Sequence, residues 1–370
     1  MSLASQRLGS RWLGSRSQLE HIPLIRKGFR WKSPVKLLFF DDEENLPPTL
    51  DNYIRGIIVD MKRFLCICLS PAIDATVRMN AWPTDGCIIK NAVDTFAPGG
   101  KTVNVARWLA KRGATVACGG LLGEDNAVMF EKELKKYGIE DRFVRIPGLT
   151  RVNEMFVTPQ GSFKVNRPAF PGVGVDVLIS AEAKPSLRSK SLEQCGPQSF
   201  FNEDSFDGDC VVVLSGSLPK DWPVDTYRHL VAAAKKAGAK VVLDASGKAL
   251  VEGVRAHPDV IKPNAEECEA LIGFVPKSPD DFARATAALK AFCDYPIISD
   301  GGAGCWFDGT FVPAPAVEVL DTTAAGDTLL AEWCFSGDPK LAVAAGSAAC
   351  TMPGGEPPAI ELVERLRSLG

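Results

Sequence analysis

The sequence contains little histidine, and its few histidines lie far apart. Only three occur in 370 residues, at His21, His229 and His257. They form neither a metal-binding cluster nor a Ser-His-Asp arrangement, which argues against zinc enzymes and triad hydrolases. The eleven cysteines are scattered and contain no CxxC pair. This pattern argues against a disulfide scaffold and indicates a reducing cytoplasm.

Long apolar runs and a strong charge of either sign are also missing. No apolar run reaches the length needed to span a membrane. The formal net charge is −3, with 42 Lys and Arg against 45 Asp and Glu. We therefore expect neither nucleic acid nor a membrane surface as a partner. With 46% hydrophobic residues, the chain can bury a sizeable core.

Residues 1–60 differ in composition from the rest of the chain. The first forty carry eight Lys or Arg and one acidic residue, Glu20, together with several serines. Such a start is typical of an organelle transit peptide, and equally of upstream sequence translated from a wrongly chosen start codon. We favour the second interpretation, because Met61 opens "MKRFLCICLSPAID", which reads as a natural first strand. We expect a single domain over residues 61–370, with 1–60 outside the fold.

From Met61 onward, short apolar runs alternate with helix-like segments. The expected strands are residues 64–69, 114–118, 211–215, 240–244, 259–261 and 296–299, and the expected helices are 103–112, 126–137, 225–237 and 280–293. Gly113, Gly138 and Gly238 follow three of these helices as C-cap glycines. This alternation predicts a three-layer α/β/α fold with a mostly parallel central sheet.

Two stretches interrupt the alternation, at residues 74–98 and 150–172. Both contain short runs of strand-like sequence, such as "RVNEMFVT" and "SFKVN". We expect them to form a small separate β-sheet that caps the main sheet. Residues 180–209 are polar and irregular, and we expect a surface excursion there that ends in a weak helix.

Small or ionic residues follow four of the expected strands. They are Ser215, Asp244, Ser246, Lys262, Asn264, Ser299 and Asp300. In open parallel sheets, ligands bind just beyond the carboxyl ends of the strands. The four strand ends therefore predict one polar crevice.

The stretch "LDTTAAGDTLLAEW" at residues 320–333 combines a tight turn with a carboxylate. Its apolar spacing predicts a helix that starts near Ala325. Exposed N–H groups at a helix start bind anions, and Ala324, Ala325 and Gly326 have so little side chain that a phosphate can approach the backbone closely. Asp327 would stand beside that phosphate, where a carboxylate can accept the proton of a hydroxyl that attacks phosphorus. The spacing alone leaves open that Asp327 merely favours the helix dipole.

The stretch "TFAPGGKTVNVARWL" at residues 95–109 imitates a phosphate-binding P-loop. Gly100, Lys101 and Thr102 supply the GK[ST] ending, and a helix follows. The first glycine of that motif, however, would fall on Thr95, and Pro98 removes an N–H from the phosphate cradle. We therefore do not favour a P-loop NTPase.

Together these residues resemble the ribokinase superfamily, also called the PfkB carbohydrate kinases. The resemblance covers nearly all of residues 61–370 and rests on two signatures, "PGGKTVNVARWLAKRGA" and "DTTAAGD". Between them, "TRVNEMFV", "SGSLP", "DASGKAL" and "KPNAEE" are similar to the branch that phosphorylates sugar phosphates. The resemblance implies a ribokinase-like fold in which the stretches 74–98 and 150–172 form a β lid over the sugar.

The resemblance also implies roles for individual residues. Asp327 would be the catalytic base, and the N–H groups of Ala324, Ala325 and Gly326 would form the anion hole. The residues implied for the sugar are Asp74, Gly99, Gly100, Lys101 and Asn104, and those for the phosphate that the substrate already carries are Arg151, Lys164 and Ser215. Those implied for ATP are Lys262, Ser299, Gly301 and Gly304, while Asn264 and Glu267 match an NxxE motif that orders Mg²⁺ through its waters.

Several of these residues also have a plainer interpretation. Lys101 and Lys164 are compatible with solvated surface charges, and Arg151 with a charge that protects a strand edge. Glu267 is compatible with a residue that only favours a helix start.

Three features depart from the family pattern, and the first is that residues 1–60 have no counterpart in it. Thr102 stands where the sugar-phosphate branch usually has Gly or Ala, and we expect its branched side chain to narrow the sugar site or shift its loop. After Asp327 the chain is short by about three helical turns relative to that pattern, and we expect looser nucleotide binding.

The resemblance implies a carbohydrate kinase, a phosphotransferase with an alcohol group as acceptor, that uses ATP and Mg²⁺. The expected substrate is a phosphorylated ketose, with fructose 1-phosphate, converted to fructose 1,6-bisphosphate, as the first candidate. The alternatives are a tagatose-6-phosphate or fructose-6-phosphate kinase, a free-sugar or nucleoside kinase of the same superfamily, and a catalytically weakened sugar-phosphate-binding protein. A homodimer through the β lid is a further implication.

Overall fold

The computed structural model describes residues 62–90, 92–170 and 209–369. The leader expected at 1–60 lies outside these ranges, and so do residues 171 and 172 of the second lid stretch and all of the 180–209 segment except its last residue. None of the helices described is long and apolar enough to cross a lipid bilayer.

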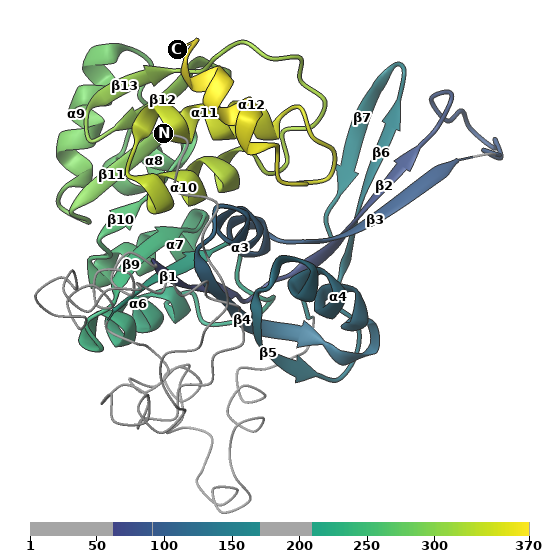
Figure 1. Ribbon diagram of the computed structural model, residues 1–370, viewed down its shortest axis with the longest axis horizontal. Coiled ribbons are helices and arrows are strands. Elements are labelled where there is room, and N and C mark those ends of the chain that lie inside the picture. The colour runs from purple at the N-terminus through teal and green to yellow at the C-terminus, as the bar shows by residue number, and fades with distance from the viewer. Residues whose placement is uncertain (1–61, 91, 171–208, 370) are drawn as a thin grey trace, which may run out of the picture. The chain divides into compact units, whose positions relative to one another are not determined.

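A nine-stranded sheet forms the centre of the described fold (Figure 1). In spatial order its strands are β13 (Thr310–Pro313), β12 (Gly304–Phe307), β11 (Tyr295–Asp300), β10 (Val260–Ile261), β9 (Lys240–Asp244), β8 (Cys210–Ser215), β1 (Arg63–Cys68), β4 (Thr115–Gly123) and β5 (Glu140–Ile146). The strands from β11 to β5 run parallel, whereas the β12–β13 hairpin joins β11 in the antiparallel direction. The predicted mostly parallel sheet is confirmed. The sequence pattern does not predict the hairpin at its edge.

Helices cover both faces of this sheet. They are α3 (Lys101–Lys111), α4 (Val128–Tyr137), α6 (Thr226–Lys236), α7 (Gly247–Gly253), α8 (Ala265–Ile272), α9 (Pro279–Leu289), α10 (Ala325–Ser336), α11 (Pro339–Ala349) and α12 (Ile360–Arg367), with the one-turn 3-10 helices η3 (Glu124–Asn126), η8 (Val254–Ala256) and η9 (Gly301–Ala303). Alternate residues of β1 point to opposite faces. Phe64 and Cys66 pack in a core with α3, α4, α10, α11 and α12, while Leu65 and Ile67 pack in a second core with α6, α7, α8 and α9. These are the three layers that the sequence predicts.

Local signals in the sequence set the ends of several helices. Gly138 ends α4 in a left-handed conformation, as predicted. Gly113 and Gly238 also have positive φ angles, but each lies one residue beyond the residue that caps its helix. Ser278 and Asp281 form a reciprocal capping box at the start of α9, with proline at the first helical position.

The two lid stretches form a second, four-stranded sheet that projects from the main body (Figure 1). Its strands, in spatial order, are β3 (Val93–Gly99), β2 (Ala72–Arg78), β6 (Val152–Thr158) and β7 (Gly161–Val165). The central pair β2–β6 is parallel, and the outer pairs are antiparallel. The expected small second sheet is therefore present at the predicted positions.

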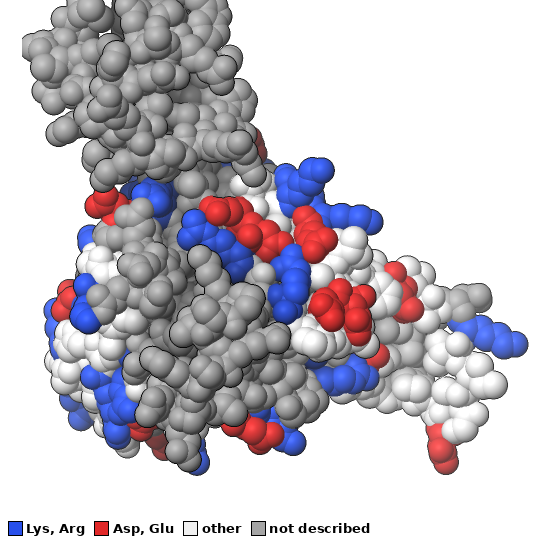
Figure 2. Space-filling view, turned by 90° about the horizontal axis from the view of Figure 1, so that it is seen from below, with Lys and Arg blue, Asp and Glu red and all other residues white. Residues whose placement is uncertain are grey.

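Charged side chains of both signs are interspersed on the face that Figure 2 shows. No continuous basic area stands out among the described residues of that face. This is in keeping with the net charge of −3.

Candidate active site

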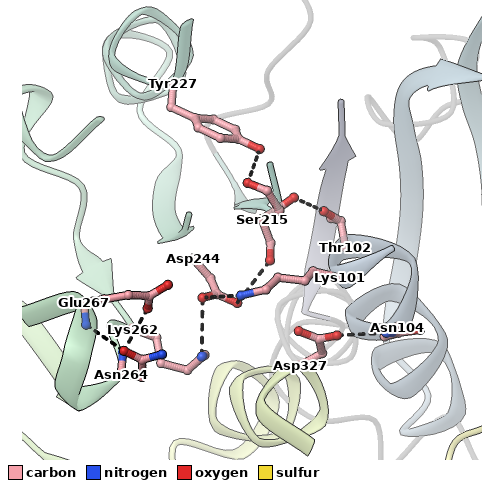
Figure 3. A network of polar contacts seen from close by, with 11 residues as sticks. Lys101, Thr102, Asn104, Ser215, Tyr227, Asp244, Lys262, Asn264, Glu267 and Asp327 are labelled. Atoms are coloured by element: carbon pink, nitrogen blue, oxygen red, sulfur yellow. Dashed lines mark hydrogen bonds and ion pairs between the residues drawn. The ribbon is translucent and has the colours of Figure 1, made fainter. Parts of the chain in front are cut away.

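The carboxyl ends of β8, β9 and β10 meet the N-terminal ends of α3 and α10 at one group of polar side chains (Figure 3). Asp244, the last residue of β9, is its centre. The Asp244 side chain is fully buried, and its Oδ1 lies 3.3 Å from the Nζ atoms of both Lys101 and Lys262. Ser215 Oγ donates a hydrogen bond to the Oδ2 atom at 3.2 Å. Polar residues from the predicted strand ends therefore meet around a buried carboxylate that pairs with two cations.

The charges in this group fix one another's protonation states. Burial opposes ionisation of Asp244, but Lys262 and Lys101 outweigh it and hold the pKa of the carboxyl below its ordinary value. Asp244 is in turn the main reason that the pKa of Lys101 is raised, against the opposing effect of burial. Both partners are consequently charged at neutral pH.

The Lys262 ammonium lies against the start of α10. A methyl group added at Gly326 would come within 3.4 Å of Lys262 Nζ. The space at the start of α10 is therefore bordered by Lys262 as well as by Lys101, whose ammonium acts on Asp327. Two ammonium groups beside a helix N-terminus form an environment suited to phosphate groups.

Asp327 lies in the first turn of α10 and is only 4% exposed. Asn104 Nδ2 donates a hydrogen bond to Asp327 Oδ2 at 2.8 Å. Burial raises the pKa of Asp327 to about 6, with Asp244 adding to the rise and Lys101 and Lys262 opposing it. Such a carboxylate is largely ionised at pH 7 and still accepts a proton readily, as a general base must.

Asp321 fixes the turn that leads into α10. Its Oδ1 accepts hydrogen bonds from the N–H and the hydroxyl of Thr323 at 2.8 and 2.6 Å. Its Oδ2 accepts one from the N–H of Gly354 at 3.0 Å. The turn is thus tied both to itself and to the segment that follows α11.

Two of the three main-chain N–H groups expected to bind anions are available. Those of Ala324 and Gly326 have no hydrogen-bond partner within the described ranges. The N–H of Ala325 instead donates to the carbonyl oxygen of Thr322 at 3.3 Å. The expectation of three free groups needs this correction, because the tight turn places Thr322 over the third.

Gly99 and Gly100 form the joint between β3 and α3. A Cβ atom at Gly99 would lie 2.1 Å from Asp74 Oδ2, so the Asp74 carboxylate can pack there only against a glycine. Gly100 has a φ angle of +108°, which side-chain-bearing residues rarely adopt. Asp74 Oδ1 also accepts a hydrogen bond from Asn153 Nδ2 at 3.3 Å. The joint therefore holds a carboxylate of the second sheet next to the start of α3.

A small hollow lies between the second sheet and the turn before α10. It is lined by Asp74, Ala75, Thr76, Asn153, Met155 and Lys164 on one side and by Asp321, Thr323 and Gly354 on the other. Two of the residues implied for the sugar and its phosphate, Asp74 and Lys164, thus face the signature turn.

Arg151, which precedes β6, is a cation without a carboxylate partner among the described residues. Its guanidinium donates hydrogen bonds to the carbonyl oxygens of Ser70, Pro71 and Arg167 at 3.1, 3.3 and 2.7 Å. Burial lowers its pKa. Since a guanidinium has five N–H donors, two remain for an anion.

Ser215 does not accompany Arg151 in the way the resemblance implies. Its hydroxyl is bound to Asp244, because Ser215 is the last residue of β8 and points into the buried ionic group. Two residues further on, Ser217 Oγ lies 3.2 Å from the Oγ of Ser70, whose carbonyl oxygen accepts a hydrogen bond from Arg151.

Thr102 points into the core instead of the sugar site. Its side chain is fully buried, and its Oγ1 lies 3.0 and 2.6 Å from the carbonyl oxygens of Ile67 and Ser215 (Figure 3). The expectation that it narrows the sugar site is wrong, because the residue after Lys101 on a helix points in a different direction from Lys101.

The residues implied for ATP and Mg²⁺ lie at the ends of β10 and β11. Asn264 Oδ1 accepts the N–H of Glu267 at 2.7 Å, and Glu267 Oε2 accepts the N–H of Asn264 at 3.0 Å, a capping box for α8. Asn264 also pairs with Ser299 in a parallel bridge, while Gly301 opens η9 and Gly304 begins β12. The Glu267 Oε1 atom takes no part in the box. Oxygen atoms of this kind suit Mg²⁺ bound through water, so the residues fit the ion.

Two residues of the site have no individual role in the sequence prediction, although Asp244 is among the strand-end residues expected at the crevice. Asp244 carries a signal, because a carboxylate at the end of a buried parallel strand is placed at the ligand edge. Arg107 carries none. It is 2% exposed on α3, and its Nη2 donates to Asn104 Oδ1 at 2.5 Å. Its burial depends on a partner from another helix, Glu133, at 3.1 Å.

Known carbohydrate kinases are similar to this chain over most of its length. The profile of the pfkB family carbohydrate kinases matches residues 69–166 and 188–334. The 1-phosphofructokinase of Haemophilus influenzae is 33% identical over 279 residues, which are 73% of this chain and 83% of that protein. The 1-phosphofructokinase of Rhodobacter capsulatus is 31% identical over 283 residues, covering 73% and 82%.

Solved structures share the fold. Phosphofructokinase-2 from Escherichia coli in complex with potassium has a TM-score of 0.70 and 21% identity, and the match covers 84% of this chain and 99% of that one. A nucleoside kinase from Methanocaldococcus jannaschii has a TM-score of 0.60 and 16% identity, covering 84% and 99%. The architecture is therefore common to kinases of different acceptors.

Proposed function

This chain belongs to the pfkB family of carbohydrate kinases and is a phosphotransferase that acts on an alcohol group of a sugar phosphate. We propose that it transfers the γ-phosphoryl group of ATP to a phosphorylated ketose. The first candidate is fructose 1-phosphate, with fructose 1,6-bisphosphate as product. The observation that carries the proposal is the buried Asp327, whose pKa of about 6 suits a base, at a helix start bordered by two lysines.

In the proposed reaction, the acceptor hydroxyl oxygen bonds to the γ-phosphorus and the bond from that phosphorus to the β-phosphate oxygen breaks, releasing ADP. The hydroxyl proton passes to the Asp327 carboxylate. Lys101, Lys262 and the free N–H groups at the start of α10 stabilise the negative charge of the group in transit. The second sheet covers the sugar and excludes water.

Mg²⁺, when bound with the nucleotide, would offset phosphate charge in this site. We propose that Asn264 and Glu267 hold it through water. Ser299, Gly301 and Gly304 would line the nucleotide. The substrate's own phosphate would be bound by the two spare donors of Arg151, aided by Lys164 across the hollow.

Glu267→Gln is expected to raise the Mg²⁺ concentration needed for half-maximal rate about tenfold, with little change in thermal stability. Glutamine keeps the capping box, because its amide oxygen still accepts the Asn264 N–H, but it removes the carboxylate charge. The rate is measured against MgCl₂ at fixed ATP. Asp281→Asn, which alters the capping box of α9, is the matched control. An unchanged Mg²⁺ requirement in Glu267→Gln would reduce Glu267 to a helix cap.

Arg151→Ala is expected to raise the KM for fructose 1-phosphate about 10- to 100-fold and the KM for unphosphorylated fructose less than threefold, since a charge-assisted pair with the phosphate is lost. Steady-state kinetics with both acceptors provide the comparison. Arg167→Ala is the control, because the Arg167 side chain binds Val152 and Glu154 instead. Equal rises for both acceptors would place the phosphate elsewhere.

A coupled assay of ADP release tests the proposed function directly. The acceptors are fructose 1-phosphate, fructose 6-phosphate, tagatose 6-phosphate, the corresponding free sugars and a nucleoside. We expect the highest kcat/KM with fructose 1-phosphate. Preference for an unphosphorylated acceptor would favour a free-sugar or nucleoside kinase, and binding without turnover would favour a sugar-phosphate-binding protein.

We also propose a homodimer formed through the second sheet. Its described residues expose several large apolar side chains, including Val93 (60%), Phe96 (56%) and Phe163 (41%). Exposed apolar surface on one element typically marks an interface. Light scattering would give the mass of two chains.

The cysteines of the described ranges are all free, which fits the proposed reducing cytoplasm.

A further inference from the structure

We propose that Arg107 is a positioning residue that makes Asn104 a one-way partner of Asp327, able to donate a hydrogen bond to the ionised carboxylate and unable to accept one from the protonated acid. The proposal rests on the function proposed above. It adds a reason why a buried carboxyl remains a base at the pH at which the enzyme works.

A line of four polar side chains connects α4 to α10 through α3. Glu133 Oε1 lies 3.1 Å from Arg107 Nη1, and Arg107 Nη2 lies 2.5 Å from Asn104 Oδ1. Asn104 Nδ2 then lies 2.8 Å from Asp327 Oδ2. Arg107 and Asn104 are 2% and 5% exposed, so water does not compete for these contacts. They are three residues apart on α3, which places them on one side of the helix.

The chemistry of the three groups allows one orientation of the amide. A guanidinium only donates hydrogen bonds, and an ionised carboxylate only accepts them. The Asn104 oxygen must therefore face Arg107, and its nitrogen must face Asp327. Gly355 leaves room for the amide in this orientation, since a Cβ atom there would lie 3.1 Å from Asn104 Oδ1.

Proton uptake by Asp327 changes which orientation of the Asn104 amide would be favoured. A protonated carboxyl can donate, and a free asparagine amide would turn to accept that hydrogen bond with its oxygen. Arg107 already occupies this oxygen, so the turned orientation is blocked and the protonated form gains nothing. Removing the block stabilises the protonated form, which raises the pKa of Asp327.

Other charged groups also act on Asp327. They are Lys101 from α3, Lys262 after β10 and Asp244 from β9. Arg107 itself has a counter-ion, Glu133, and acts on the buried thiol of Cys118. The experiment must therefore separate an effect transmitted by Asn104 from a direct effect of the Arg107 charge.

Arg107→Gln and Arg107→Lys form the informative pair. Glutamine hydrogen-bonds as donor or acceptor and leaves the Asn104 amide free to turn, whereas lysine only donates. In the pH profile of kcat/KM, we expect Arg107→Gln to raise the acid-limb pKa by about one unit. The rate at pH 6 then falls about fivefold, and the rate at pH 8.5 falls less than twofold. Arg107→Lys is expected to retain most of the wild-type profile.

The double variant Asn104→Ala/Arg107→Gln identifies the route. If Arg107 acts through Asn104, the double variant has the same acid-limb pKa as Asn104→Ala alone. Arg145→Met is the matched control, because it also removes an ion pair with a glutamate of α4, Glu131, without contact to Asn104. The proposal is overturned if Arg107→Gln still shifts the acid-limb pKa in the Asn104→Ala background. It is also overturned if Arg107→Gln lowers the thermal stability but leaves the pH profile of kcat/KM unchanged.

A second readout makes failure of this proposal distinguishable from failure of the proposed function. Carbon-13 NMR of the aspartate carboxyl groups, assigned with Asp327→Asn, follows the titration of Asp327 in the same variants without any turnover. A wild-type chain that is inactive with every acceptor removes the proposed function. The Asp327 titration still decides the role of Arg107: an Arg107→Gln curve that coincides with the wild-type curve overturns it.

Discussion

Asp327→Asn is expected to lower kcat by about 10²–10⁴ while preserving the fold. Asparagine fills the same space and still accepts the hydrogen bond from Asn104, but it cannot take a proton from the acceptor hydroxyl. Steady-state kinetics of ADP release measure the loss, and circular dichroism checks the fold. A kcat near the wild-type value would remove Asp327 from the role of base.

The same substitution is expected to stabilise the protein at neutral pH. The pKa of Asp327 is about 6 in the folded chain, against an ordinary value of 3.8. The folded state therefore binds more protons than the unfolded state between these values, and wild-type stability falls as the pH rises from about 4 to about 6. Asparagine avoids this loss of about 3 kcal/mol. Denaturant unfolding should show a gain at pH 7 that vanishes near pH 4.

Asp244→Asn is expected to lower the free energy of unfolding by about 3–5 kcal/mol and kcat/KM by about 10²-fold. It leaves the ammonium groups of Lys101 and Lys262 without the carboxylate that each approaches to 3.3 Å. The two cations then repel each other in a largely buried site and no longer point together at the start of α10. Denaturant unfolding and steady-state kinetics measure the two effects.

A control variant and the pH dependence of stability test whether the effect of Asp244→Asn comes from the buried ion pairs. Glu140→Gln, which removes an exposed ion pair with Arg142, should change the unfolding free energy by less than about 1 kcal/mol. The pKa of Asp244 lies below 3.8 in the folded state, so its contribution to stability is present above that pH and is lost only in stronger acid. An Asp244→Asn variant with wild-type stability at pH 7 would contradict the claim that Asp244 stabilises the fold by pairing with Lys101 and Lys262.

The main sheet and its ligand edge are predictable because their signals are local. Runs such as "VVVLS" and "KVVLD" become β8 and β9, and the polar residues that follow them meet in one site. The small residues before Asp327 likewise predict a helix start, and α10 begins at Ala325.

Features that depend on partners distant in the chain escape prediction. An arginine on a helix normally lies in solvent, and only the packing of α4 against α3 buries Arg107 beside Glu133. The inward turn of Thr102 depends on carbonyl groups of β1 and β8. The N–H of Ala325 is hydrogen-bonded because of a turn geometry that the residue types do not predict. In each case the deciding contact joins residues that lie apart in the chain, and a single sequence does not show which of them meet.

The joint that Gly99 and Gly100 form between β3 and α3 has a mechanical consequence. β3 ends at Gly99 and α3 begins at Lys101, so there is no slack chain between them. A tilt of the projecting sheet must therefore rotate the peptide planes that immediately precede the lysine. We therefore expect any movement of the second sheet to move the Lys101 ammonium as well, because the two are joined directly through Gly100.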